Sequence, residues 1–377
     1  MSVLEYRLSS ALLRVLGWLF SRLPGDSGRV VLASARKPEL DGNLARLLAL
    51  MRARRPDLHY MPLPEPYAYG LAGKIRYLIR TIRGMYHVRT AGLVVVDNAY
   101  LPIHVAPHAP RTTIVQVWHA TGALKRFGAD TIRPLDEPER TFLHRYYDWV
   151  VTSGEASRVP WSRAFRTPLD RVLGLGTPRT DAFHDPAAVA AMRDGVLAAY
   201  PALTGRRVIL YAPTFRGRGP AKRAATGLDG ARLRALLPPT DVLVLKTHPN
   251  LDPSGIELAG FDVVIDPVTD VNDVLAAADI LVTDYSSSVF EAALLRKRLL
   301  LLVPDLAEYE ADPGLYLDYR TEMIGTQVVD TDAAADAILR DAFDLGPYDA
   351  FIARHLGGCD GRATERFVER FLGAGVR

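Results

Sequence analysis

Short apolar runs alternate with helix-forming segments along most of the chain. The runs Val30–Ala33, Gly92–Asp97, Thr113–Trp118 and Trp149–Ser153 are separated by segments such as the predicted helix Asn43–Arg54. Runs of this kind, with little apolar–polar alternation, are typical of strands that are buried on both faces of a parallel sheet. The alternation with helices therefore predicts an α/β architecture with parallel sheets.

A second alternating series follows a predicted helix at Ala187–Ala199. Its strands are predicted at Val208–Tyr211, Val242–Lys246, Val263–Ile265, Ile280–Val282 and Leu299–Val303. A chain of 377 residues is long enough for two or three domains, each with a sizeable core. Two such series predict two sheets, one in each half of the chain.

The stretch Asp279–Lys297 has the local pattern of an anion site. An apolar strand leads through Asp284 and the hydroxyl run Ser286–Ser288 into a helix predicted at Val289–Lys297. The first N–H groups of a helix lack intrahelical partners and favour negative charge. A serine N-cap on an ordinary strand–helix unit explains part of this pattern. Three consecutive hydroxyls, with Asp284 before and Glu291 after, exceed what a cap requires.

Two histidines follow apolar strands, one in each series. His119 comes after Thr113–Trp118, and His248 comes after Val242–Lys246. Loops at the carboxyl ends of parallel strands are where open α/β sheets bind ligands. A lone histidine is commonly structural, but two in the same topological position favour a role in proton transfer near neutral pH.

The N-terminal 90 residues carry an excess of nine positive charges, whereas the remainder carries an excess of six negative charges. This asymmetry favours a local anionic partner, such as lipid headgroups, over nucleic acid along the whole surface. The only cysteine, Cys359, excludes an intrachain disulfide and favours a reducing compartment. No apolar run reaches 18 residues, so no transmembrane helix is expected.

Two amphipathic helices are predicted in this basic region, at Met1–Leu23 and Lys74–Arg83. Either they lie on an anionic membrane surface, or they dock on the following domain as ordinary surface helices, and the pattern leaves both open. On the first helix, Arg7, Ser10 and Arg14 are expected to face away from the apolar stripe formed by Leu4, Leu8, Ala11, Leu12, Val15, Leu16 and Leu19. The basic face of the second consists of Arg76, Arg80 and Arg83.

Common cofactor and metal motifs are absent from the sequence. There is no GxxxxGK[ST], HExxH or CxxC, and Gly174–Gly176 lacks the third glycine of a dinucleotide fingerprint. Asp330-Thr-Asp332 has the spacing of a metal-binding DxD, but it precedes three alanines and is better interpreted as a helix N-cap. We therefore predict no metal site and no cofactor, and the metal requirement stays open.

Seven segments, in this order, are similar to one known set of motifs. They are WHATGALKRFG at Trp118–Gly128, TSGEASRVPWSRAF at Thr152–Phe165, GTPRTD at Gly176–Asp181, YAPTFRG at Tyr211–Gly217, KTHPN at Lys246–Asn250, TDYSSSVFEAALLRK at Thr283–Lys297 and DGRATER at Asp360–Arg366. Together they resemble the CDP-glycerol glycerophosphotransferase family of bacterial teichoic acid and related polymer synthesis. The resemblance spans about Arg29 to Leu372.

The resemblance implies a GT-B-like fold, in which two Rossmann-like domains face a cleft. The expected parts are an amphipathic helix (1–28), an acceptor- and membrane-facing domain (29–184), a CDP-donor-binding domain (185–355) and a C-terminal helix that crosses back to the first domain (356–377). Because the family's acceptors are lipid-linked, the resemblance also implies peripheral attachment at the cytoplasmic face of the membrane. Arg76, Arg80, Arg83 and Lys125 are expected on the membrane and acceptor side.

The implied reaction moves glycerol phosphate, or a related alditol phosphate, from CDP-glycerol or CDP-ribitol to an acceptor hydroxyl and releases CMP. Such a transferase must remove one proton and neutralise pyrophosphate charge. The resemblance makes His119 the base. It makes Asp284 and Glu291 either ligands of ribose or glycerol hydroxyls or supports of the loop, with support favoured for Asp284. The expected donor-phosphate residues are Thr214, Arg216, His248, Ser286, Ser287 and Ser288.

Two other functions fit the fold. One is a GT-B glycosyltransferase that uses a nucleotide sugar, since fold does not fix function. The other is a catalytically inactive, membrane-bound module that binds wall polymer. The motif set argues against the first, and the presence of both His119 and His248 argues against the second. The alditol, the acceptor, the polymer length and the oligomeric state are not set by these residues.

Overall fold

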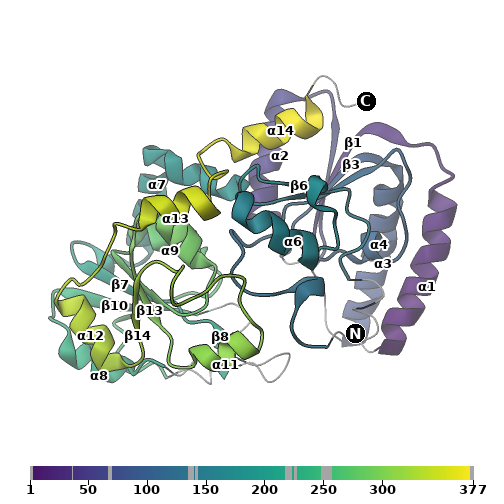
Figure 1. The fold of residues 1–377 in the computed structure, drawn as a ribbon. Coiled ribbons are helices and arrows are strands. Elements are labelled where there is room, and N and C mark those ends of the chain that lie inside the picture. Colours follow the sequence, from purple (N-terminus) through teal and green to yellow (C-terminus); the bar gives the residue numbers. More distant parts are fainter. Residues whose placement is uncertain are drawn as a thin grey trace. The chain divides into compact units, whose positions relative to one another are not determined.

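Two six-stranded parallel sheets form the cores of two compact units (Figure 1). The first unit comprises Met1–Asp181 with His355–Arg377, and the second comprises Ala182–Arg354. The structure is a computed structural model. It describes residues 3–35, 37–66, 70–134, 140, 143–216, 223–224, 227–247 and 257–373. The predicted α/β class with parallel sheets is confirmed in both halves of the chain.

In the first sheet, the strand that comes first in the sequence, β1, lies between two other strands rather than at the edge. In sheet order its strands are β2 (His59–Pro64), β1 (Asp26–Ser34), β3 (Ala91–Val96), β4 (Thr113–Gln116), β5 (Trp149–Val151) and β6 (Val172–Leu173). All neighbouring pairs are parallel. Since the chain moves from β1 to β2 on one side and to β3 on the other, the strand order reverses at β1.

Helices cover both faces of this sheet (Figure 1). On one face, α2 (Gly42–Arg54) and α14 (Ala363–Leu372) share a buried apolar cluster with alternate residues of the strands. On the other face, α3 (Gly70–Thr90) and α4 (Leu101–His104) pack against α1 (Val3–Phe20) around Leu13 and Met85. The last helix is therefore part of the core of the first unit.

The helix α1 docks through the side that lies opposite its apolar stripe. Ser10 and Leu13 are fully buried, whereas the predicted apolar stripe faces outward, with Leu8 64% and Val15 59% exposed. The small residue Gly17 allows α1 to pack closely on α3. A side chain there would be too close to its neighbour, because a Cβ on Gly17 would lie 3.0 Å from the Met85 sulfur. The more hydrophobic stripe cannot approach α3 so closely. Ser10 therefore lies on the side of α1 away from the apolar stripe, as predicted, and this side is the one that docks.

The second sheet repeats the pattern. In sheet order its strands are β11 (Val263–Ile265), β10 (Asp241–Lys246), β7 (Arg207–Tyr211), β12 (Ile280–Thr283), β13 (Arg298–Leu302) and β14 (Thr326–Val328), all parallel. The helices α8 (Gly230–Leu236) and α12 (Thr331–Leu339) share an apolar cluster with it. The helices α7 (Pro186–Ala199), α9 (Val271–Ala277), α10 (Ser288–Leu294), α11 (Leu306–Ala311) and α13 (Tyr348–His355) complete the unit.

Several element boundaries differ from the predicted ones, and some strands were not predicted. The strand β4 ends at Gln116, because Trp118 has a left-handed φ of 51° that ends the ladder. The helix α10 ends at Leu294, and Arg296 with φ of 50° turns the chain into β13. The strand β14 was not predicted, since its short sequence TQV lacks an apolar run. An unpredicted two-stranded ladder also joins β8 (Phe215–Arg216) to β9 (Arg223–Ala224).

Candidate active site

Three of the predicted site residues, His119, Arg216 and Asp284, lie near the point at which their sheet reverses its strand order. In the first sheet β1 lies between β2 and β3, and in the second β7 lies between β10 and β12. Ligands of open α/β sheets bind outside the carboxyl ends of strands at such a point. His119 follows β4, Arg216 follows β7 and Asp284 follows β12, so each is at a carboxyl end.

His119 is half-buried and is oriented by a backbone carbonyl. Its Nδ1 lies 3.1 Å from the carbonyl oxygen of Asp97, the residue after β3. A carbonyl only accepts hydrogen bonds, so Nδ1 carries the proton of a neutral ring and Nε2 carries the lone pair. This tautomer makes Nε2 of His119 the atom that accepts a proton, as general-base catalysis requires.

The residue before His119 is held in an unfavourable conformation. Trp118 has a φ of 51°, a region that bulky residues rarely adopt. Its N–H donates to Oε1 of Gln116 at 2.8 Å, and its carbonyl accepts from Nδ2 of Asn43 at 2.8 Å. Its ring stacks on Phe127 with centroids 5.1 Å apart. The peptide and the ring of Trp118 are therefore both fixed.

Two further imidazoles near Trp118 are structural. Nε2 of His104 and Nδ1 of His144 lie 2.8 and 3.2 Å from the hydroxyl of Tyr147, and all three side chains are buried. Burial lowers the pKa of His104 to about 3 and also lowers the pKa of His144 well below its ordinary value. Both rings are thus neutral at physiological pH and pack as part of the core.

In the second unit, Arg216 lies between two carboxylates. Its Nη1 donates to Oδ2 of Asp284 at 2.8 Å and to the hydroxyl of Thr214 at 2.9 Å. Its Nε and Nη2 donate to the two oxygens of Asp305 at 2.7 and 3.1 Å. Asp284 in turn accepts from the N–H and the hydroxyl of Thr214 at 2.9 and 2.8 Å. This cluster joins the carboxyl ends of β7, β12 and β13.

Charge pairing dominates the titration of this cluster. Burial disfavours the charged form of Arg216, but the hydrogen bond to Asp305 and the charge of Asp284 outweigh it and raise its pKa. Burial likewise disfavours the charge on Asp305, yet Arg216 lowers the pKa of that carboxyl. The hydroxyl of Tyr285 also donates to Asp305 at 3.0 Å. One guanidinium thus faces two carboxylates, which reduces its capacity to neutralise a pyrophosphate.

The three serines lead into α10 with different surroundings. The hydroxyl of Ser286 accepts from the N–H of Ser288 at 3.2 Å and lies 2.8 Å from its hydroxyl. Ser287 has the N-cap position, but its side chain makes no capping hydrogen bond. Ser286 and Ser287 are half-buried, whereas Ser288 is buried. Glu291 is 1% exposed, so its carboxylate lies among core side chains rather than at the surface.

The remaining predicted residues, His248, Lys125 and the three arginines near residue 80, belong to different segments of the chain. His248 lies outside the described residues, as does most of the KTHPN segment. Lys125 is half-buried in the loop that follows His119. Arg76, Arg80 and Arg83 are exposed on α3. The arginines on α3 therefore belong to the N-terminal helices, whereas Lys125 belongs to the His119 loop.

Two of the seven motifs hold the C-terminal helix in the first unit. The carboxylate of Asp181 accepts from the N–H groups of Ala363 and Thr364 at 2.9 and 2.8 Å and from the Thr364 hydroxyl at 2.5 Å. Gly176 has a φ of 96°, and a Cβ there would lie 1.8 Å from the carbonyl oxygen of Gly358. GTPRTD and DGRATER are thus explained by packing of α14.

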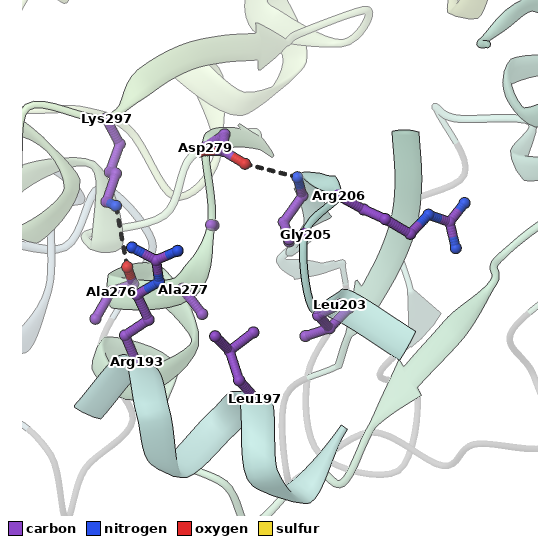
Figure 2. Close-up of a pocket in the computed structure, with 11 residues that line it drawn as sticks. Arg193, Leu197, Leu203, Gly205, Arg206, Ala276, Ala277, Asp279 and Lys297 are labelled. Atoms are coloured by element: carbon purple, nitrogen blue, oxygen red, sulfur yellow. Dashed lines mark hydrogen bonds between the residues drawn. The ribbon is translucent and has the colours of Figure 1, made fainter. Parts of the chain in front are cut away.

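Figure 2 shows a cavity of about 210 Å³ in the second unit, between α7 and α9. Two of its polar groups are bound within the protein: Lys297 donates to the carbonyl of Ala276 at 3.2 Å, and Asp279 accepts from the N–H of Val208 at 2.7 Å. Asp279 precedes β12 and Val208 is the second residue of β7, so this cavity is at the amino-terminal edge of the sheet. It lies at the opposite edge from Arg216.

The segment Asp330-Thr-Asp332 was interpreted as a helix N-cap rather than as a metal-binding motif. Asp330 accepts from the N–H of Ala333 at 2.8 Å as the N-cap of α12, so its predicted capping role is confirmed. Asp332 pairs with Arg232 at 2.9 Å. Within the ranges that the structure describes, no group of three or more His, Cys, Asp or Glu side chains is arranged to hold a metal ion.

Several residues of the site were not found from the sequence. Asn43 and Gln116 fix Trp118, and the carbonyl of Asp97 orients His119. Asp305 stands one residue beyond the predicted strand Leu299–Val303, after Pro304, so the carboxyl-end rule that selected the other loops would also have selected it. Asn43 had no such signal, because an asparagine at a helix start is ordinarily a cap.

The family profile described as "CDP-Glycerol:Poly(glycerophosphate) glycerophosphotransferase" matches residues 17–373. The chain is 31% identical to the teichoic acid ribitol-phosphate primase of Bacillus spizizenii, over 98% of the chain and 96% of that protein. It is 29% identical to the teichoic acid poly(ribitol-phosphate) polymerase of the same species, over 97% of the chain but 60% of that longer protein.

A solved structure of the wall teichoic acid polymerase TagF, in a variant soaked with CDPG, has the same fold. It superimposes with a TM-score of 0.74 over 99% of this chain and 98% of that chain, at 20% sequence identity. This likeness confirms the GT-B-like fold class.

Proposed function

Because the chain belongs to the CDP-glycerol:poly(glycerophosphate) glycerophosphotransferase family, we propose that His119 is the base of its transfer reaction. The chain is a transferase that moves an alditol phosphate from a CDP-alditol in wall polymer synthesis. In that reaction an acceptor hydroxyl attacks the β-phosphorus of the donor and CMP leaves. One proton must depart from the hydroxyl as the new O–P bond forms.

The observation that carries this proposal is the hydrogen bond between Nδ1 of His119 and the Asp97 carbonyl at 3.1 Å. It selects the tautomer in which Nε2 accepts the proton of the hydroxyl. The buried rings of His104 and His144 are neutral and bonded to Tyr147, so they do not compete for this role. His119 combines half-exposure with a defined acceptor atom.

We place the CDP-alditol donor at the carboxyl ends of β7 and β12, in the second unit. The half-buried hydroxyls of Ser286 and Ser287 and the start of α10 supply donors to phosphate oxygens. His248 is proposed to stabilise the leaving phosphate, as the family resemblance implies. Since two carboxylates hold Arg216, its role is to fix Thr214 and the β12 loop, and its contribution to charge neutralisation is the smaller part.

We further propose that the outer face of α1 and α3 attaches the protein to an anionic membrane. Leu4, Leu8 and Val15 on α1 are 65%, 64% and 59% exposed, and Leu71 and Ile79 on α3 are 78% and 62% exposed. An apolar row flanked by arginines suits the headgroup plane of a bilayer. Among the described residues, no helix has both the length and the hydropathy to cross a membrane.

The donor assignment is tested by CMP release. The protein is incubated with a lipid-linked primer and, in separate reactions, CDP-glycerol, CDP-ribitol or a UDP-sugar. Release of CMP from one or both CDP-alditols, with no transfer from the UDP-sugar, supports the proposal. Transfer from the UDP-sugar alone would overturn it in favour of a nucleotide-sugar glycosyltransferase, and no transfer from any donor would favour a polymer-binding module.

Membrane attachment is tested by sedimentation with anionic vesicles. Changing Arg76, Arg80 and Arg83 to Glu removes three positive charges that are each worth about 1 kcal/mol near such a surface, and adds three negative ones. The variant should stay in the supernatant. The matched control changes three exposed arginines on α2 of the same unit, Arg46, Arg52 and Arg54, to Glu. If both variants are released equally, net charge alone explains the loss of binding. That result would refute the proposal that the outer face of α1 and α3 binds the membrane.

A further inference from the structure

The side-chain amide of Asn43 joins two distant segments of the first unit at the His119 loop. Asn43 is the second residue of α2 and is 4% exposed. Its Nδ2 donates to the carbonyl of Trp118 at 2.8 Å, 75 positions away. Its Oδ1 accepts from the N–H of Arg179 at 2.9 Å, 136 positions away. Both ends of the amide are therefore used between segments, although Asn43 stands in the first turn of a helix.

Ordinary capping does not explain these two hydrogen bonds. The N-cap of α2 is Asp41, and Asp41 makes no side-chain capping hydrogen bond. A capping asparagine would turn its oxygen toward the N–H groups of its own helix. The oxygen of Asn43 is instead directed to the GTPRTD segment, and its nitrogen to the residue before His119.

The conformation of Trp118 gives this contact its significance. A φ of 51° is unfavourable for a tryptophan, so the surrounding structure must impose it. The N–H of Trp118 is held by Gln116 and its carbonyl by Asn43. The next peptide begins at that carbonyl and leads directly to His119. If the carbonyl of Trp118 rotated, the ring of His119 would move away from the Asp97 carbonyl that sets its tautomer.

We propose that Asn43 is a positioning residue that holds the His119 loop in its reactive conformation. This inference rests on the proposed role of His119 as the base. An amide is required because it donates and accepts at once, whereas a carboxylate only accepts. Displacement of a catalytic group by about 1 Å can lower turnover about 10²-fold. Asn43 thus acts on turnover through geometry, without contact with the donor.

The test uses Asn43→Asp, which is isosteric, removes the donor to the Trp118 carbonyl and adds a buried negative charge that the control must also carry. The carboxylate still accepts from the N–H of Arg179, but it cannot donate to the carbonyl of Trp118. Asn272→Asp is the matched control, because Asn272 is also the second residue of a helix, α9, and is 7% exposed. For both variants, kcat and KM are measured by CMP release, affinity for CDP-glycerol by calorimetry, and Tm by circular dichroism.

We expect Asn43→Asp to lower kcat about 10- to 100-fold while donor affinity stays within about twofold of wild type. Asn272→Asp should keep wild-type kcat. A merely structural role for Asn43 would lower Tm and leave the kcat of the folded fraction unchanged. That result would overturn the inference. If Asn43→Asp does not fold, the smaller variant Asn43→Ser is measured with the same expectation and the same refuting result.

His119→Ala separates this inference from the proposed function. If His119→Ala is slow and Asn43→Asp has wild-type kcat, His119 keeps its role and Asn43 loses the one proposed here. If His119→Ala turns over at the wild-type rate, the assignment of the base fails and the inference about Asn43 fails with it. Slow turnover in both variants with intact donor affinity is the result that supports both.

Discussion

Removal of the Arg216 guanidinium should destabilise the second unit and not only weaken donor binding. In Arg216→Ala, the carboxylates of Asp284 and Asp305 lose three hydrogen bonds from one cation. The hydroxyl of Thr214 loses a fourth hydrogen bond from the same guanidinium. Breaking a fully buried ion pair costs about 3–5 kcal/mol. Because the side chains of Arg216 and Asp305 are 17% and 27% exposed, we expect about 2–4 kcal/mol here.

The assay is urea unfolding followed by circular dichroism, with Arg232→Ala as the control. Arg232 forms an ion pair with Asp332 in the same unit, but the two side chains are 57% and 65% exposed. Solvent screens such an exposed pair, so its loss should change stability far less than the loss of a buried one. All four tryptophans lie in the first unit, so tryptophan fluorescence should change less than the dichroism signal does. Equal free-energy losses for Arg216→Ala and Arg232→Ala would refute the assignment of Arg216 as the centre of a buried cluster.

Three further predictions concern the first unit. Leu8→Ser combined with Ile79→Ser should weaken vesicle binding while changing stability by less than about 0.5 kcal/mol per site, by sedimentation and thermal unfolding; unchanged sedimentation would argue against this face. Burial lowers the pKa of His104 to about 3, so the unfolded state takes up its proton first; this group alone should lower stability by about 2–3 kcal/mol between pH 6.5 and 4.5, and His104→Asn should lose that share of the slope in urea titrations, while the share from His144 remains. Asp181→Ala should cost about 2–4 kcal/mol because Thr364 and its neighbour lose a charged cap; a change in turnover without one in stability would contradict this.

The strands and their order of appearance were predictable because buried parallel strands have continuous apolar sequences. Ile280–Thr283 and Asp241–Lys246 are fully buried, and both were found from composition alone. The short strand Thr326–Val328 is only partly buried and carries polar residues, so no pattern marked it. The hydrophobic effect thus specifies the centre of each sheet far better than its edge.

The face by which α1 docks could not be read from hydrophobicity. The most apolar stripe predicts the buried side of a helix when close approach is not required. Here Ser10 and Gly17 permit close packing on α3, and Leu8 stays outside. The choice depends on the shape of the partner helix, which is tertiary information.

The candidate site, like the fold, could be predicted from the sequence only in part. His119 was selected because it follows an apolar strand, a rule that needs no partner, whereas Arg216 was selected from the family resemblance. Their surroundings were not predictable, since the partners of Arg216 lie 68 and 89 positions along the chain. A basic residue near a phosphate-binding motif suggested charge neutralisation. The fold instead brings two carboxylates to it, which shifts its role toward holding the loops together.

The role of His119 is tested most directly by a single-turnover measurement with His119→Ala. Enzyme in excess is mixed with CDP-alditol and primer, and CMP formation is followed while donor affinity is measured separately. We expect transfer to slow about 10²–10⁴-fold, the usual effect of losing a general base, and donor affinity to stay within about twofold of wild type. Transfer at the wild-type rate would contradict the assignment of His119 as the base.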